Sequence, residues 1–424
     1  MTQWQSSKAV ASSKSAAASS GTDRLGLVAL TLLFFAWGFL TALNDVLSPH
    51  LRSVFALTFA ESALVQTAFF FAYFVSSLPS SAIVARIGYK NGLAVGLVFM
   101  AIGALMFLPA ATWVSFPLFL GALFVLGSGI TLLQVAANPY VTMLGAPEGA
   151  ASRLTLTQAF NSFGTTLAPI IGGSLILSAV TSDNGGDRAL QAAQQASAVR
   201  GPYLVIALVL TVMAVAFYFL RLQEPSEEPE MPTWKAIKEC FAQPRLSLGV
   251  LAIFIYVGTE VTIGNFLINF ITAEIGGSNV AAAHMVGFYW GGAMVGRFVG
   301  SALLRRINAP LLLAIVSTLA CALVGVSLVT TGHVAVYALI AIGLCNATMF
   351  PTIFSLGVEG LGRLSGVGSS LLVQGIVGGA LIPLVIGALA DRIGLGNALG
   401  YCIGLYACIG LYGLYCQRLA RQVA

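Results

Sequence analysis

The sequence predicts an all-α membrane protein in which twelve transmembrane helices form two pseudo-symmetric bundles of six. Three observations predict this fold class. The chain of 424 residues is 58% hydrophobic and only 8% charged, whereas soluble domains carry about 25% charged residues. Apolar stretches of about 20 residues, the length that a hydrocarbon core of ~30 Å requires, occur twelve times. One charged, proline-rich interior segment separates the first six stretches from the last six.

The spans follow one another with short connections. We expect them at residues 26–48, 60–84, 91–111, 115–144, 151–180, 202–222, 246–273, 281–303, 309–331, 333–357, 365–390 and 397–418. The first 23 residues are rich in Ser and Ala and lack the apolar core of a signal peptide, so we expect a disordered cytoplasmic tail there. The chain is thus divided into a tail (1–23), a first bundle (24–222), a cytoplasmic linker (223–245) and a second bundle (246–424).

The distribution of Lys and Arg predicts the orientation of these spans. With the amino terminus inside, fifteen cations fall on the inner side and four on the outer side, namely Arg52, Arg188, Arg200 and Arg392, while Arg297 lies within a span. Because positive charge accumulates in cytoplasmic loops, both termini are predicted to be cytoplasmic. The net charge of +5 then reflects membrane orientation and not nucleic-acid binding. We expect a multi-pass protein of the plasma membrane, the inner membrane of a bacterium.

The two halves of the chain resemble each other weakly. Pro139-Tyr-Val-Thr-Met-Leu-Gly145 aligns with Pro351-Thr-Ile-Phe-Ser-Leu-Gly357 at an offset of 212, which is half of 424. The same offset aligns Gln134 with Asn346, and offsets of 214 and 215 align Pro169 with Pro383 and Asp45 with Glu260. Chance similarity between apolar helices is the alternative. Parallel repeats of six spans place the substrate site at mid-membrane between the halves.

Two carboxylates lie in these apolar spans. At the centre of a membrane helix an aspartate costs roughly 2.5 to 3.5 kcal/mol, so such a residue is a functional candidate. Asp45 shares a helical stripe with Trp37, Thr41 and Asn44, although it stands near the outer end of its span, where a carboxylate can simply reach water. Glu260 lies about fourteen residues into the seventh span, where it can carry a coupling proton, accept a sugar hydroxyl or bind sodium.

Neutral amides and two tryptophans complete the candidate site. Gln134 with Asn138, and Gln158 with Asn161, lie four and three residues apart, so each pair shares a helix face. Amides both donate and accept hydrogen bonds, which suits the hydroxyl groups of a sugar; the alternative role is hydrogen bonding between helices. The second half offers Asn346 and Gln374. Indole rings stack on the apolar face of a pyranose, and Trp37 and Trp290 are candidates, with packing as the alternative.

Several longer motifs resemble a known family. The short loops Arg86-Ile-Gly88-Tyr-Lys90 and Asp391-Arg392-Ile-Gly394 are similar to the basic loop of the major facilitator superfamily. Further motifs resemble the fucose permease family of sugar:cation symporters, namely Leu43-Asn44-Asp45, Gln134-Val-Ala-Ala-Asn138-Pro139-Tyr140, Arg153 to Gly164, Tyr256-Val-Gly-Thr-Glu260, Tyr289 to Arg297 and Phe350 to Gly357. The resemblance implies the major facilitator fold. The fucose permease carries a glutamate where this chain has Gln134, so the resemblance favours the glucose/galactose branch.

These observations predict a secondary active importer of a glucose/galactose-type hexose or an N-acetylhexosamine, coupled to a proton by alternating access. A sodium-coupled symporter and an uncoupled facilitator are the alternatives. The chain has three histidines that lie far apart, His50, His284 and His333, and no HExxH motif, so we expect no enzyme. We expect no cofactor other than the co-transported H⁺ or Na⁺, no structural metal site, and a monomer whose partners are the sugar and the bilayer.

Overall fold

The computed structural model describes residues 25–42, 55, 59–172, 200–222, 229–276 and 278–423, and within these ranges it contains helices and no strands. Two candidate site residues, Asn44 and Asp45, lie outside the described residues. The first half contains the helix Leu25–Ala42 and the four helices α2 (Phe59–Thr112), α3 (Phe116–Met143), α4 (Ala150–Gly172) and α6 (Arg200–Phe219). A short 3₁₀ turn, η1 (Pro147–Gly149), precedes α4.

The second half follows a short linker helix, α7 (Trp234–Phe241). Its long helices are α8 (Pro244–Ile275), α9 (Asn279–Leu303), α10 (Ala309–Val329) and α16 (Cys402–Val423). Two further spans are broken. One comprises α11 (Gly332–Asn346) and α12 (Met349–Val358); the other comprises η4 (Gly362–Leu364), α13 (Ser365–Gln374), η5 (Gly375–Val377) and α14 (Gly378–Ile393). The short helix α15 (Leu395–Gly400) leads into α16.

The twelve predicted spans are confirmed. Among the described residues, nine helical stretches are long and apolar enough to cross a membrane. One of them, Thr67–Thr112, holds two spans because its backbone turns at Gly88. The remaining two are α4 and α9, whose 23 and 25 residues span about 35 Å or more at 1.5 Å per residue. Apolar side chains such as Leu208, Val212 and Val385 are exposed on the outer faces of the helices, as contact with lipid requires.

Glycine makes the same turn in two loops. Gly88 has φ 81° and ψ 168°, and Gly394 has φ 85° and ψ 150°. Both follow the dipeptide Arg-Ile, at the end of the second and of the eleventh span. This combination of φ and ψ is essentially restricted to glycine and costs a residue with a side chain on the order of 1 to 3 kcal/mol, so glycine allows each helix to end and the chain to turn back at once.

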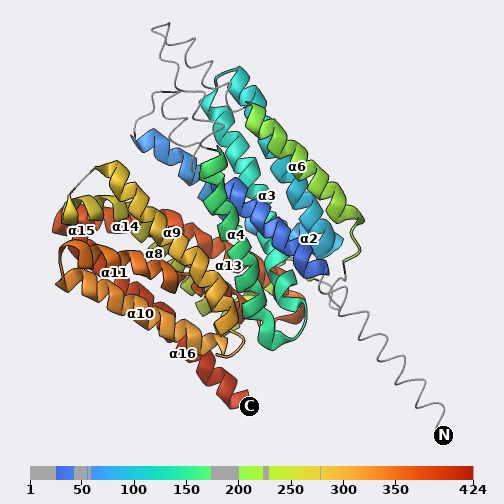
Figure 1. Ribbon diagram of the computed structural model, residues 1–424. Coiled ribbons are helices and arrows are strands. Elements are labelled where there is room, and N and C mark those ends of the chain that lie inside the picture. Colours follow the sequence, from blue (N-terminus) through green and yellow to red (C-terminus); the bar gives the residue numbers. More distant parts are fainter. Residues whose placement is uncertain are drawn as a thin grey trace.

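The helices form two bundles, one from each half of the chain, and these bundles pack against each other (Figure 1). Within the first half α2 packs against α3 and α6, and within the second half α10 packs against α11 and α16. Across the halves α4 packs against α9 and α12, while α13 packs against α2 and α3. Hydrogen bonds join α4 and α9 at the helix ends predicted to be cytoplasmic. There the Ser152 hydroxyl donates to the Ser301 carbonyl (2.7 Å), and the Ser301 hydroxyl donates to the Ser152 carbonyl (2.9 Å).

Candidate functional site

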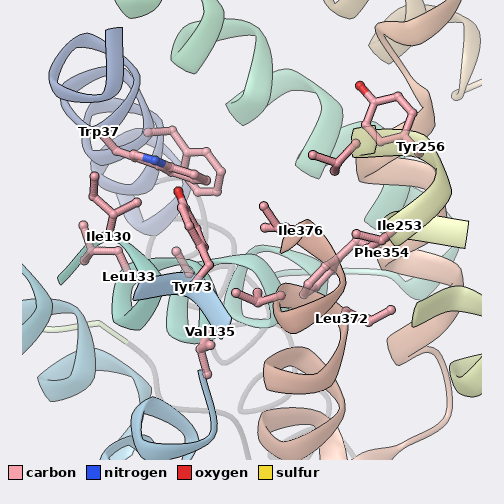
Figure 2. Close-up of a cluster of buried hydrophobic side chains, with 14 of the residues drawn as sticks. Trp37, Tyr73, Ile130, Leu133, Val135, Ile253, Tyr256, Phe354, Leu372 and Ile376 are labelled. Atoms are coloured by element: carbon pink, nitrogen blue, oxygen red, sulfur yellow. The ribbon is translucent and has the colours of Figure 1, made fainter. Parts of the chain in front are cut away.

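The first half contributes a cluster of Trp37, Tyr73 and Gln134. The Gln134 amide nitrogen donates to the Tyr73 hydroxyl at 2.9 Å, and the Trp37 indole nitrogen faces the same hydroxyl (Figure 2). Trp37 is buried against Phe34, with ring centroids 5.1 Å apart. The helix Leu25–Ala42, α2 and α3 therefore meet at this tyrosine. Trp37 packs inside the protein, which agrees with the packing role that the sequence left open.

Two amides on α3 keep buried polar atoms without partners. The side-chain oxygen of Gln134 and both amide atoms of Asn138 have no hydrogen-bond partner among the described residues. Asn138 is fully buried, and it lies one helical turn after Gln134. Because buried polar groups in proteins are nearly always paired, each such atom calls for an explanation, such as a ligand or water. These two residues fit a site that a hydroxylated ligand completes.

The second half contains a matching cluster around Asn346. Its amide nitrogen donates to the Tyr289 hydroxyl at 2.8 Å, and its amide oxygen accepts from the Tyr406 hydroxyl at 2.8 Å. The backbone carbonyl of Asn346 accepts from the Tyr256 hydroxyl at 3.2 Å. Both the amide nitrogen and the amide oxygen of Asn346 are thus hydrogen-bonded to tyrosines, from α9 and α16. In this conformation Asn346 joins helices, the alternative role that was kept open for the amides.

The amide and tyrosine pairs repeat across the two halves. Gln134 pairs with Tyr73, and Asn346 pairs with Tyr289. The amides are 212 residues apart (346 − 134) and the tyrosines 216 (289 − 73), which agrees with the offset found in the sequence. In each half the fourth span donates an amide proton to a tyrosine of the second span. The weak sequence repeat therefore corresponds to a repeated hydrogen bond.

Glu260 lies on α8 beside this second cluster. One carboxylate oxygen of Glu260 is buried without a hydrogen-bond partner among the described residues. The Tyr256 hydroxyl one turn earlier lies beside the carboxyl group, and Arg297 of α9 acts on it as an opposing charge. The helix α8 runs unbroken from Pro244 to Ile275. Gly258 and Gly264 therefore do not interrupt the helix, and Asn265, five residues after Glu260, lies roughly 140° further round it.

Arg297 connects Glu260 to the contact between the halves. Its Nε donates to the Ala347 carbonyl (3.4 Å), where α11 gives way to α12, and its terminal nitrogen donates to the Ser162 hydroxyl on α4. The guanidinium group therefore lies at the carboxyl end of α11. A charge inside a bilayer is costly unless it is paired or hydrogen-bonded. Here two hydrogen bonds and the nearby carboxylate of Glu260 compensate the charge.

The other predicted residues have individual surroundings. Gln158 on α4 is only 5% exposed and makes no side-chain hydrogen bond to a described residue. Asn161 donates to the Phe34 carbonyl (3.0 Å), and Gln374 donates to the Phe74 carbonyl (3.2 Å) across the halves. Trp290 is 45% exposed and packs edge-on against Tyr289. Substrate binding by each of these residues stays a prediction.

A cavity of about 780 Å³ lies elsewhere, at the helix ends predicted to be cytoplasmic. Its lining comes from both halves and includes Glu148, Arg305 and Glu359, but none of the predicted site residues. Apolar side chains from both halves, among them Val135, Ile376 and Phe354, fill the space between the first cluster and Tyr256 (Figure 2). The described residues contain no group of three or more His, Cys, Asp or Glu that could hold a metal ion.

Sequence reasoning missed the tyrosines. Tyr73, Tyr289 and Tyr406 are buried hydrogen-bond partners of the amides, yet they read as ordinary apolar residues in their spans. One signal was available, because Tyr73 and Tyr289 fall at nearly the offset that relates Gln134 to Asn346. A search for tyrosines at this offset would have found the pair.

The fold, with one polar cluster inside each half, is that of a membrane transporter and not of an enzyme. The chain belongs to the Major Facilitator Superfamily, because the model of that family matches residues 27–375.

Relatives of known name place it within the superfamily. It is 52% identical to a glucose/galactose transporter of Brucella abortus biovar 1 (strain 9-941), over 92% of this chain and 93% of the relative. It is 35% identical to the L-fucose-proton symporter of Escherichia coli (strain K12), over 86% of each chain. The crystal structure of the transporter FucP in the outward conformation superimposes with a TM-score of 0.87 at 31% identity, over 93% of this chain and 99% of that one. The resemblance seen in the sequence is confirmed.

Proposed function

We propose that the protein is a secondary active sugar importer that takes a glucose/galactose-type hexose or an N-acetylhexosamine and couples its entry to a proton. It works as a monomer in a bacterial inner membrane, with both termini in the cytoplasm. A sodium-coupled symporter is the second candidate, because one oxygen of Glu260 has no partner among the described residues and carboxylates also bind hard cations.

The unpartnered buried amides carry this proposal. An unsatisfied buried amide costs about 1 to 3 kcal/mol, and α3 bears this cost at Gln134 and at Asn138. A sugar hydroxyl both donates and accepts, so one hydroxyl group satisfies either side of an amide. The structure thus keeps an energetic cost that a polyol, but not an apolar ligand, removes. The names of the relatives, a glucose/galactose transporter and an L-fucose-proton symporter, support the same class of substrate.

The coupling ion is assigned to the carboxylates. Gln134 is a neutral amide, so α3 provides no acid at this position, and Glu260 and Asp45 are the candidates that we retain. Arg297 lies between Glu260 and the Ser162 hydroxyl of the other half. A change in the charge of Glu260 therefore changes its electrostatic attraction to Arg297, which is hydrogen-bonded to the other half through Ser162. Such a link is what ion coupling needs.

Alternating access follows from the contacts between the halves. The serine pair Ser152 and Ser301 and the bond from Ser369 to the Val135 carbonyl (3.2 Å) hold the halves together on the side predicted to be cytoplasmic. The similar crystal structure is that of FucP in the outward conformation. We infer that sugar enters from the outside in this state. Rocking of the halves then breaks these bonds and opens the other side.

Uptake into liposomes tests the proposal. The purified protein is reconstituted, and entry of labelled glucose, galactose, fucose and N-acetylglucosamine is followed under an imposed pH gradient and, separately, under an imposed sodium gradient. We expect accumulation of glucose or galactose under the pH gradient alone. Strict dependence on sodium would select the second candidate, equilibration without accumulation would select a facilitator, and no uptake of any sugar would overturn the assignment.

A matched pair of variants tests the coupling residue. Glu260→Gln removes the negative charge but not the shape, so accumulation against a gradient should be lost while sugar counterflow persists. Glu274→Gln on the same helix is the control, because its side-chain oxygen accepts from the Gly332 amide at 2.8 Å and a glutamine oxygen can do the same. Unchanged accumulation in Glu260→Gln would exclude Glu260 as the coupling residue.

A further inference from the structure

The linker between the halves contains a helix that the sequence pattern did not predict. The segment 223–245 is rich in charge and proline, yet Trp234–Phe241 forms the helix α7. Its start is capped by Thr233, whose side chain accepts from the Ala236 amide at 3.2 Å. The next helix, α8, begins at Pro244. The helix α7 therefore lies where the seventh span enters the membrane.

One face of α7 is fixed to the protein. Ala236 and Cys240 are fully buried. Glu239 forms an ion pair with Arg363 (3.1 Å), as does Glu230 just before the helix (3.1 Å), and the Glu230 amide donates to the Arg363 carbonyl at 2.9 Å. Arg363 belongs to η4, the turn that leads into α13. Two carboxylates and one backbone bond thus join the linker to the start of the eleventh span.

The opposite face carries two aromatic rings and two cations. Trp234 is 71% exposed and Phe241 is 51% exposed, and Lys235 and Lys238 are also exposed. These four residues stand at positions i, i+1, i+4 and i+7, which form one side of a helix. The Lys238 amine lies 5.6 Å from the centre of the Trp234 ring. The acidic and basic side chains of α7 thus lie on different sides of the helix, since Glu239 pairs with Arg363 while both lysines are exposed.

We propose that this exposed face of α7 is a docking surface for the headgroups of anionic phospholipids. Tryptophan and phenylalanine beside lysine are the composition of helices that lie in the membrane interface. The cations complement an anionic leaflet, and the position next to Pro244 brings the face to the depth of the headgroups. The assignment of this leaflet to the cytoplasmic side rests on the proposed orientation, whereas the chemistry of the face does not.

Lipid binding at α7 also acts on the contact between the halves. The turn η4 that holds α7 continues into α13, and Ser369 of α13 donates to the Val135 carbonyl of the first half. Further along, Gln374 donates to the Phe74 carbonyl. Headgroups that hold α7 at the membrane therefore stabilise the start of a helix that closes the side predicted to be cytoplasmic. Anionic lipid thus favours the conformation described here.

Quenching of tryptophan fluorescence tests the docking surface directly. The protein is placed in nanodiscs of phosphatidylcholine alone and of phosphatidylcholine with an equal share of phosphatidylglycerol, with lipids brominated close to the headgroup. The signal of Trp234 is the part of the quenching that Trp234→Phe removes. We expect this part to be larger with phosphatidylglycerol and to fall as salt is added.

Removal of the lysines should release the helix. In Lys235→Gln/Lys238→Gln the ratio of lipid-bound to free α7 should fall about five-fold per lysine, which corresponds to ~1 kcal/mol each. Lys235→Arg/Lys238→Arg should keep the signal. Arg305→Gln/Arg306→Gln is the matched control, because it removes two exposed cations from the loop between α9 and α10.

The proposal is overturned if Trp234 is not quenched, or if its quenching is the same in both lipid compositions and in the glutamine variant. Neither reading depends on sugar transport. A failure of the lipid test thus leaves the proposed function untouched, and a failure of sugar uptake leaves the lipid test valid.

Discussion

The hydrogen bonds around Asn346 allow a quantitative prediction of stability. In Asn346→Ala two side-chain bonds are lost, to Tyr289 and from Tyr406. Such bonds contribute about 0.6 kcal/mol each in membrane proteins. Tyr289 still donates to the Glu260 carbonyl, but the fully buried Tyr406 hydroxyl loses the only partner described for it. An orphaned buried group costs about 1 to 3 kcal/mol, so we expect Asn346→Ala to lower the free energy of unfolding by about 2 to 4 kcal/mol.

A double-mutant cycle isolates the orphaned group. Tyr406→Phe alone leaves the Asn346 amide oxygen without its donor and should also destabilise the protein. In the double variant neither group is left unpaired, so the combined loss should be at least ~1 kcal/mol smaller than the sum of the single losses. The free energies are measured by unfolding in mixed micelles with increasing sodium dodecyl sulfate. Additivity within about 0.5 kcal/mol would refute the reasoning, and Tyr401→Phe, at an exposed tyrosine of the same span, is the control.

Three further predictions follow from local geometry. Gly88→Ala should lower the melting temperature, because the backbone of Gly88, with φ 81° and ψ 168°, costs a residue with a side chain on the order of 1 to 3 kcal/mol. Gly325→Ala on α10, with open space around its added methyl, should not lower it. Equal melting temperatures of the two variants would contradict the role of the turn. Gly343→Ala should lower the free energy of unfolding by about 1 to 3 kcal/mol through overpacking, because the added methyl would meet the Tyr289 carbonyl of α9. The methyl of Gly291→Ala meets no atom within 4 Å, so this variant should be tolerated. Thermal unfolding compares the two variants. Burial, with the charges of Glu239 and Glu230, raises the pKa of Cys240 to about 11, so only about a thousandth of this thiol is ionised at pH 8. The rate of alkylation of Cys240, measured by mass spectrometry, should be low at pH 8 and rise towards pH 11. The rate at pH 8 should increase in Arg363→Ala, because this variant lacks the ion pairs that hold the linker. An unchanged rate in that variant would contradict the docking of α7.

The fold was predictable because membrane insertion imposes strong rules on sequence. A span must be apolar and about 20 residues long, and even the more polar helices α4 and α9 meet the length. The interior of two spans was not predictable. No sequence pattern indicated that the tenth and eleventh spans are broken after Asn346 and Gln374. Both breaks lie next to predicted site residues, and of the two only the second begins at a glycine, Gly375.

The residue types of the candidate site were predictable from the sequence, but their hydrogen-bond partners were not. Helical spacing placed Gln134 and Asn138 on one face, and the structure keeps them together on α3. Helical spacing could not reveal that the Asn346 amide is hydrogen-bonded to two tyrosines while the Asn138 amide has no partner among the described residues. This distinction depends on side chains from helices distant in sequence, such as Tyr406, which is 60 residues from its partner. Local patterns carry no record of such contacts.

The most direct test of the sugar site is the stability of Asn138→Leu with and without sugar. Leucine has a similar volume and leaves no buried amide without a partner, so the empty variant should be more stable than the wild type by about 1 to 3 kcal/mol. Glucose or galactose at a hundred times its dissociation constant should stabilise the wild type by about 2.7 kcal/mol and leave Asn138→Leu unchanged. Asn91→Leu, at an exposed amide that donates to the Ile87 carbonyl, should respond like the wild type. Equal stabilisation of Asn138→Leu and the wild type by sugar would contradict the account.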